Sequence, residues 1–197
     1  MVVRFAPDGG VTWFRSYVGT GPFGGVLGLA TDSAGAIYVI GNGQGVDFGG
    51  GPVDGPYLAK LSSDGAHIWS RPVALKATAA NMYLTTVQSL PGGDVLLGGS
   101  AVGTFDLGAG LTFKLQTLLA PFVVTFDASG AAKQLGVFPG TGHANAKAAV
   151  VATDGTLLLG GRMGGTLTFP GVPPLVGAAS MSSTLADAYV ARFAWPL

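Results

Sequence analysis

The sequence predicts an all-β protein, and three observations support that fold class. The chain has 197 residues, of which 34 are Gly, none is Glu or Cys, and only 10% carry charge. Gly and Asp form helices poorly but form turns well, and the Glu side chains that often cover exposed helix faces are absent. Short apolar runs rich in β-branched and aromatic residues alternate with turns that contain Gly or Asp, which is typical of strands.

The first repeated element is a hairpin whose turn Gly lies four residues after an apolar anchor residue. A partial fourth copy, Tyr189 to Phe193, stops before its turn. The three full copies are VVRFAPDGGVTWF (residues 2–14), LAKLSSDGAHIW (residues 58–69) and VVTFDASGAAKQL (residues 123–135).

A second repeated hairpin lies between the copies of the first. Its copies are VLGLATDSAGAIYVIG (residues 26–41), YLTTVQSLPGGDVLLGG (residues 83–99) and AAVVATDGTLLLGG (residues 148–161). The equivalent residues Gly35, Gly93 and Gly155 are separated by 58 and then 62 residues. The sequence therefore has a period near 60 residues, and such a period determines the prediction of the whole fold.

Turn chemistry explains why Gly and Asp recur together. Tight hairpin turns require positive φ, which Gly adopts without a steric penalty, and a neighbouring Asp can accept hydrogen bonds from the turn backbone. The pairs Asp8-Gly9, Asp64-Gly65 and Asp154-Gly155 fit such turns. The runs IYVI, DVLL, TLLL and FVVTF between turns are typical of strands buried on both faces.

Units of two hairpins, or four strands, that recur in this way are typical of the blades of a β-propeller. The strands group as two, four, four and three, or 13 in all. We predict one repeat region over residues 1–197, made of a partial blade (2–18), two blades (26–73 and 83–138) and a partial blade (146–197). Because a closed propeller typically has at least about four blades, the chain is expected to be an incomplete ring and a fragment of a longer protein.

The repeats resemble the bacterial propeller repeats called SBBP (seven-bladed β-propeller) and, more loosely, the NHL-type propellers. The resemblance rests on ATDSAGAIYVIG and VVATDGTLLLGG, on the arm VDFGGG, and on YLAKLSSDGAHIWSR with its partial copy DAYVARF. It implies a non-catalytic binding or structural module of a secreted or cell-surface bacterial protein, whose partners are the remaining blades. No signal peptide begins this chain, so export implies that its start is missing.

Composition and motifs exclude several kinds of chemistry. The net charge is zero, which disfavours nucleic acid as a partner, and no apolar run is long enough for a membrane helix. His67 and His143 lack ligand-spaced neighbours, so no metal or cofactor is expected. There is no G-x-S-x-G or phosphate-loop motif. The alternative is a propeller-scaffold enzyme, a glycan hydrolase or lyase, that uses Asp residues.

Ligand contacts, if any, are expected in the three arms that follow the closing glycines, residues 46–57, 104–121 and 166–187. Loops on one face of a repeat array often carry binding function. Phe48, Phe105 and Phe169 are the apolar residues that these arms share, and they are the predicted contacts for a carbohydrate or protein ligand. Trp13 and Trp69 occupy equivalent positions, where packing between neighbouring blades explains them better than ligand binding does.

Overall fold

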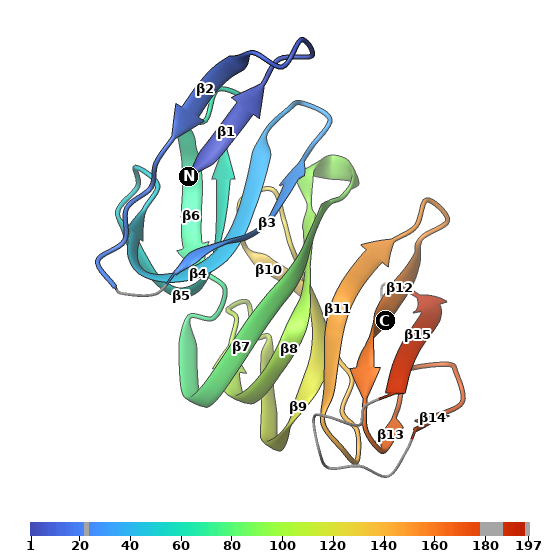
Figure 1. Cartoon of the computed structure of the whole chain (residues 1–197). Coiled ribbons are helices and arrows are strands. Elements are labelled where there is room, and N and C mark those ends of the chain that lie inside the picture. The colour runs from blue at the N-terminus through green and yellow to red at the C-terminus, as the bar shows by residue number, and fades with distance from the viewer. Residues whose placement is uncertain (22–23, 178–186, 196–197) are drawn as a thin grey trace. The chain divides into compact units, whose positions relative to one another are not determined.

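The computed structural model describes residues 1–21, 24–177 and 187–195, and these form antiparallel β-sheets (Figure 1). The single helical element among them is a three-residue 3₁₀ turn, η1 (Pro91–Gly93). The chain divides into two compact units, Met1–Val73 and Ala74–Leu197. The prediction of an all-β fold is therefore confirmed, and each unit is described by itself.

The first unit contains a hairpin and a four-stranded sheet. Strands β1 (Val2–Phe5) and β2 (Val11–Arg15) form the hairpin. The sheet has its strands in chain order, so each strand pairs with the next one in the sequence. Its members are β3 (Gly25–Thr31), β4 (Ile37–Asp47), β5 (Pro52–Leu61) and β6 (His67–Pro72).

Side chains from the hairpin region fasten it to the turn between β5 and β6. The Arg4 guanidinium and the Trp13 indole N–H both donate to the carbonyl oxygen of Ser63, at 2.6 and 3.1 Å. The Tyr17 hydroxyl donates to the Gly65 carbonyl at 3.1 Å. Trp13 and Tyr17 also pack against the buried core of the sheet. The hairpin is thus held to the sheet by polar and apolar contacts together.

The second unit contains a four-stranded sheet, a three-stranded sheet and a short hairpin. The four-stranded sheet is formed by β7 (Lys76–Ser89), β8 (Val95–Asp106), β9 (Thr112–Phe126) and β10 (Ala132–Val137). The three-stranded sheet is formed by β11 (Ala144–Val151), β12 (Thr156–Met163) and β15 (Asp187–Ala194). The short hairpin pairs β13 (Thr166–Leu167) with β14 (Leu175–Val176).

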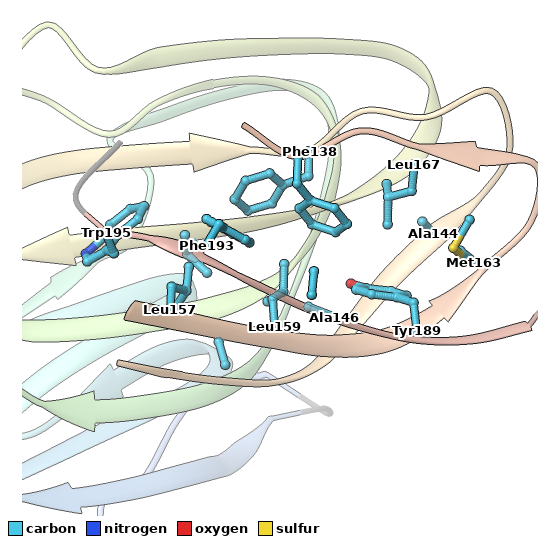
Figure 2. Close-up of a cluster of buried hydrophobic side chains, with 14 of the residues drawn as sticks. Phe138, Ala144, Ala146, Leu157, Leu159, Met163, Leu167, Tyr189, Phe193 and Trp195 are labelled. Atoms are coloured by element: carbon cyan, nitrogen blue, oxygen red, sulfur yellow. The ribbon is translucent and has the colours of Figure 1, made fainter. Parts of the chain in front are cut away.

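An apolar cluster and a set of side-chain hydrogen bonds join the two larger sheets of this unit. Figure 2 shows Phe138, Tyr189 and Phe193 within the cluster, which also includes Leu96 and Val123 of the four-stranded sheet. The side chains of β7 and β8 supply the hydrogen bonds to the backbone of β11. Gln88 accepts from the Val151 N–H at 2.7 Å and donates to its carbonyl at 2.9 Å, Thr86 accepts from Ala149, and Ser100 accepts from Ala146. The backbone N–H and C=O groups at the edge of β11 therefore have hydrogen-bond partners inside the interface, where an unpaired polar group would destabilise the fold.

Each of the larger sheets carries an ion pair at the turn between its first two strands. Asp32 pairs with Lys60 of β5 at 3.5 Å, and Asp154 pairs with Arg192 of β15. Lys60 and Arg192 occupy equivalent repeat positions, where the middle sheet has Thr125 instead. There the turn carboxylate, Asp94, pairs at 2.6 Å with Lys133 of β10, one strand further out.

The predicted groups of two, four, four and three strands correspond to the sheets formed by β1–β2, β3–β6, β7–β10 and β11, β12 and β15, but the total of 13 omits the separate two-stranded sheet of β13 and β14. The prediction that the arms are loops is wrong for the first two. Strands β4 and β5, and likewise β8 and β9, extend through these arms. The carboxylates of Asp47 and Asp106 close the hairpins by accepting N–H bonds from Gly49 and Gly108. The third arm contains β13 and β14, and its residues 178–186 lie outside the described residues.

Phe138→Ala should lower the free energy of unfolding by about 3–5 kcal/mol, because it leaves a cavity in the core. The Phe138 ring is 1% exposed and lies 5.0 and 5.2 Å, between ring centroids, from Phe169 and Phe193. Urea denaturation measures the change. The control Val176→Ala alters a side chain that is 81% exposed and should stay within about 0.5 kcal/mol of the parent. Equal changes in the free energy of unfolding for Phe138→Ala and Val176→Ala would contradict the placement of Phe138 in the core.

Thr125→Val should raise the free energy of unfolding by about 1 kcal/mol. It replaces a buried hydroxyl, which has no hydrogen-bond partner among the described residues, with a methyl group of similar size. Thr86→Val is the matched control. The Thr86 hydroxyl accepts the Ala149 N–H at 3.1 Å, so its loss should destabilise by about 1 kcal/mol. Denaturant titration measures the free energy of unfolding of both variants, which should rise for Thr125→Val and fall for Thr86→Val.

Candidate ligand pocket in the first unit

A small pocket lies in the first unit, where the segment after β2 and the start of β3 meet the middle of β4 and β5. Its volume is about 230 Å³. The side chains that shape it include Tyr17, Val26, Gln44, Phe48 and Tyr57. This volume is below the roughly 300–1,000 Å³ of pockets for drug-sized molecules, so the pocket suits a smaller ligand.

One wall of the pocket is glycine backbone that lies directly on β4. A Cβ atom at Gly21 would lie 2.8 Å from Cβ of Gln44, and one at Gly24 would lie 2.9 Å from the carbonyl oxygen of Asn42. The Thr20 N–H donates to the Gln44 carbonyl oxygen at 2.8 Å, which fixes this close approach. Any larger residue at Gly21 or Gly24 would move this wall off the strand, so these glycines define the shape of the pocket.

Aromatic side chains form another part of the lining. The ring of Phe48 lies 4.7 Å from that of Tyr17 and 5.2 Å from that of Tyr57, between centroids. The Tyr57 hydroxyl donates to the Gly25 carbonyl oxygen at 3.0 Å, which ties the aromatic wall to the start of β3. Burial raises the pKa of both Tyr17 and Tyr57, so both phenols stay neutral at physiological pH. None of the lining side chains in the described residues is charged.

The three predicted contact residues are all buried, with 4%, 3% and 2% exposure for Phe48, Phe105 and Phe169. Of the three, Phe48 lines the pocket. Phe105 stacks on Phe113 at 4.9 Å and Phe169 lies 5.0 Å from Phe138, each within the second unit. Burial favours a packing role for Phe105 and Phe169, and their contact with a ligand stays a prediction.

Sequence reasoning missed Gln44 and the glycine wall. The signal in the sequence is a dense set of glycines at 19, 21, 24 and 25. A glycine needed for close approach to another strand cannot be told from a turn glycine without knowledge of which strand it faces. The structure also brings Tyr17 and Tyr57, which lie far apart in the sequence, against the ring of Phe48.

The histidines have local partners. His67 Nε2 lies 3.1 Å from Ser70 Oγ, and His143 Nδ1 accepts the Leu119 N–H at 3.2 Å. Within the described residues, no group of three or more His, Cys, Asp or Glu side chains could hold a metal ion. In the same part of the chain, no helix is both long enough and apolar enough to cross a membrane.

Most aspartates serve the backbone of turns. Asp32 accepts the N–H groups of Ala34 and Ala36, and Asp127 accepts those of Ser129 and Ala131. Hydrogen bonds from a nearby hydroxyl hold the pKa below its ordinary value for Asp64, Asp127 and Asp154. A general acid needs the opposite shift, towards the working pH. These three carboxylates therefore suit turn formation better than proton transfer.

No model of a known protein family matches the chain. A search of curated proteins likewise finds no significant match.

Acid should destabilise the protein through these turns. The folded-state pKa of Asp127 lies below its ordinary 3.8, so the stabilisation is present above about pH 4 and is lost as the pH falls through the folded pKa. Asp127→Asn keeps the side-chain acceptor but removes the titration, so its free energy of unfolding should fall less steeply below about pH 4. Urea titrations from pH 6 to pH 2 measure this, and parallel curves for parent and variant would refute it.

Proposed function

We propose that the chain is a non-catalytic binding module, built of propeller-type blades, from an exported bacterial protein. The sheets of the repeat support the blade interpretation, since successive strands pair in chain order in both four-stranded sheets. The family resemblance, carried by ATDSAGAIYVIG and YLAKLSSDGAHIWSR, supports export and a non-catalytic role. The hydrogen bonds that lower the pKa of Asp64, Asp127 and Asp154 argue against an enzyme that uses one of these residues as its general acid.

The uncharged aromatic pocket is the observation that supports binding. We assign to it a small, neutral, ring-shaped polar ligand, and a monosaccharide unit of a glycan fits that description. Aromatic rings offer flat apolar surface to the C–H face of a sugar. The exposed Gln44 amide and the backbone of the glycine wall offer hydrogen bonds to hydroxyl groups.

The chemistry of the lining narrows the ligand further. A cationic ligand would leave its charge without a partner among the side chains that line the pocket, and an unpaired charge is costly to desolvate. The volume of about 230 Å³ fits one ring and not an extended chain, so recognition of a terminal or branching sugar is expected.

The test is a glycan array followed by calorimetric titration of the best monosaccharide. Val26→Trp should abolish binding, because it places an indole in the pocket from a side chain that is 36% exposed. Gln44→Ala should weaken binding by about tenfold through the loss of a hydrogen-bonding side chain. Gln134→Ala, on β10, is the matched control and should bind as the parent does.

Two outcomes would contradict this function. Binding that survives Val26→Trp, in a variant with an unchanged melting temperature, would place the ligand elsewhere. Release of new reducing ends from a bound glycan would show turnover and would favour the Asp-based glycan enzyme instead.

A further inference from the structure

Strand β4 contains a β-bulge beside the ligand pocket. The pairing of β4 with β5 is regular up to Gly43 and resumes at Val46. Between these points, Gln44 and Gly45 of β4 stand opposite one residue of β5, Asp54. Two residues against one define a β-bulge, which can redirect the side chains that follow it. We propose that Asp54 is a positioning residue for the ligand pocket, because its carboxylate holds this bulge in the shape that the pocket requires.

The bulge reverses which residues of β4 face the pocket. Val39, before the bulge, and Val46 and Phe48, after it, belong to the same buried apolar cluster. Because successive side chains of a regular strand point to opposite faces, Val39 and Val46 would otherwise lie on different faces of the sheet. Strand β5 has no extra residue and keeps its alternation, with Val53, Tyr57, Ala59 and Leu61 in that cluster. Without the bulge, the Phe48 ring would therefore point away from Tyr17 and from the pocket.

The bulge also holds the glycine wall in place. The Gln44 carbonyl oxygen accepts the Thr20 N–H at 2.8 Å and the Thr20 hydroxyl at 3.4 Å. The side chain of the same residue lines the pocket, next to Gly21. One residue of the bulge thus supplies a lining side chain and fixes the neighbouring wall. A change in the backbone of the bulge would displace the glycine wall, the Gln44 amide and the Phe48 ring together.

The Asp54 carboxylate fixes the backbone of the bulge. It accepts the Gly45 N–H at 2.7 Å. A bulge leaves its extra residue outside the regular ladder of hydrogen bonds, and a charged acceptor forms a stronger hydrogen bond than a neutral one does. Asp54 is itself exposed and does not line the pocket. It therefore acts on the ligand through the bulge and not by direct contact.

This inference rests on the proposed sugar-binding function, so its test has one readout with sugar and one without. Calorimetric titration uses the best monosaccharide from the glycan array. Asp54→Ala should weaken binding by about tenfold, because it removes the acceptor of the Gly45 N–H. Asp54→Asn keeps a side-chain oxygen as acceptor and should bind within about threefold of the parent. This rescue would not be expected if the carboxylate acted through its charge alone.

Asp8→Ala is the matched control. The Asp8 carboxylate also accepts a glycine N–H, that of Gly10 at 2.9 Å, and it lies in the same unit but not in the pocket lining. Its removal should leave sugar binding as in the parent. The variants are compared well below their melting temperatures, so that a loss of binding does not reflect unfolding.

The second readout is NMR of the chain without sugar. The Gly45 N–H should exchange with solvent about tenfold faster in Asp54→Ala than in the parent or in Asp54→Asn. The contacts between the Tyr17 and Phe48 rings should weaken in the same variant. Gly45→Ala disturbs the bulge while Asp54 stays in place, since the new Cβ would require positive φ and would meet Thr20 Oγ1. It should weaken sugar binding as Asp54→Ala does.

Three results would overturn the proposal: unchanged sugar binding by Asp54→Ala, binding by Asp54→Asn that is as weak as that of Asp54→Ala, or unchanged exchange of the Gly45 N–H in Asp54→Ala. An equal loss of binding in Asp8→Ala would also overturn it, because the effect would then be general. If the parent binds no monosaccharide, the proposed function fails. The exchange of Gly45 and the contact between the Tyr17 and Phe48 rings then decide by themselves whether Asp54 positions the pocket.

Discussion

The structure depends on hairpin turns that aspartate carboxylates close. The Asp32, Asp127 and Asp154 side chains each accept N–H groups from residues two or more positions later in their turns. A fixed turn fixes the register of the strands that it joins. A slip of one residue turns every side chain of a strand to the opposite face of its sheet, so in β12 it would move Leu157 and Leu159 out of the apolar cluster. Register, burial and sheet formation therefore follow from the same few side chains.

This use of aspartate also limits the chemistry that the protein can perform. With no Glu and no Cys in the chain, Asp supplies the only side-chain carboxylates. Hydrogen bonding that secures a turn also stabilises the ionised form of its carboxylate, as in Asp127. The side chains that line the pocket beside Tyr17 and Tyr57 are instead uncharged. A protein built in this way is better suited to recognise a neutral ligand than to transfer protons.

The sequence was sufficient to predict what depends on local spacing. The period near 60 residues located each hairpin, and the strand groups match the sheets. Features that depend on contacts between residues far apart in the chain could not be predicted from the sequence. The arms around Phe48 and Phe105 continue as paired strands because Asp47 and Asp106 close their tips. The pocket was missed because the role of Gly21 depends on Gln44, which lies far from it in the chain but against it in the fold.

The ion pairs at the first turn of each large sheet bear on how freely repeats could be exchanged. In two sheets the cation comes from the third strand, as Lys60 or Arg192, whereas in the middle sheet it comes from the fourth, as Lys133. A copy of β9 placed beside Asp32 would bring Thr125 and leave that carboxylate without its cation. A copy of β5 placed beside Asp94 would bring a second ammonium next to Lys133. The repeats have thus diverged at these positions, so a strand moved from one sheet to another would either lose its ion pair or add an unpaired charge.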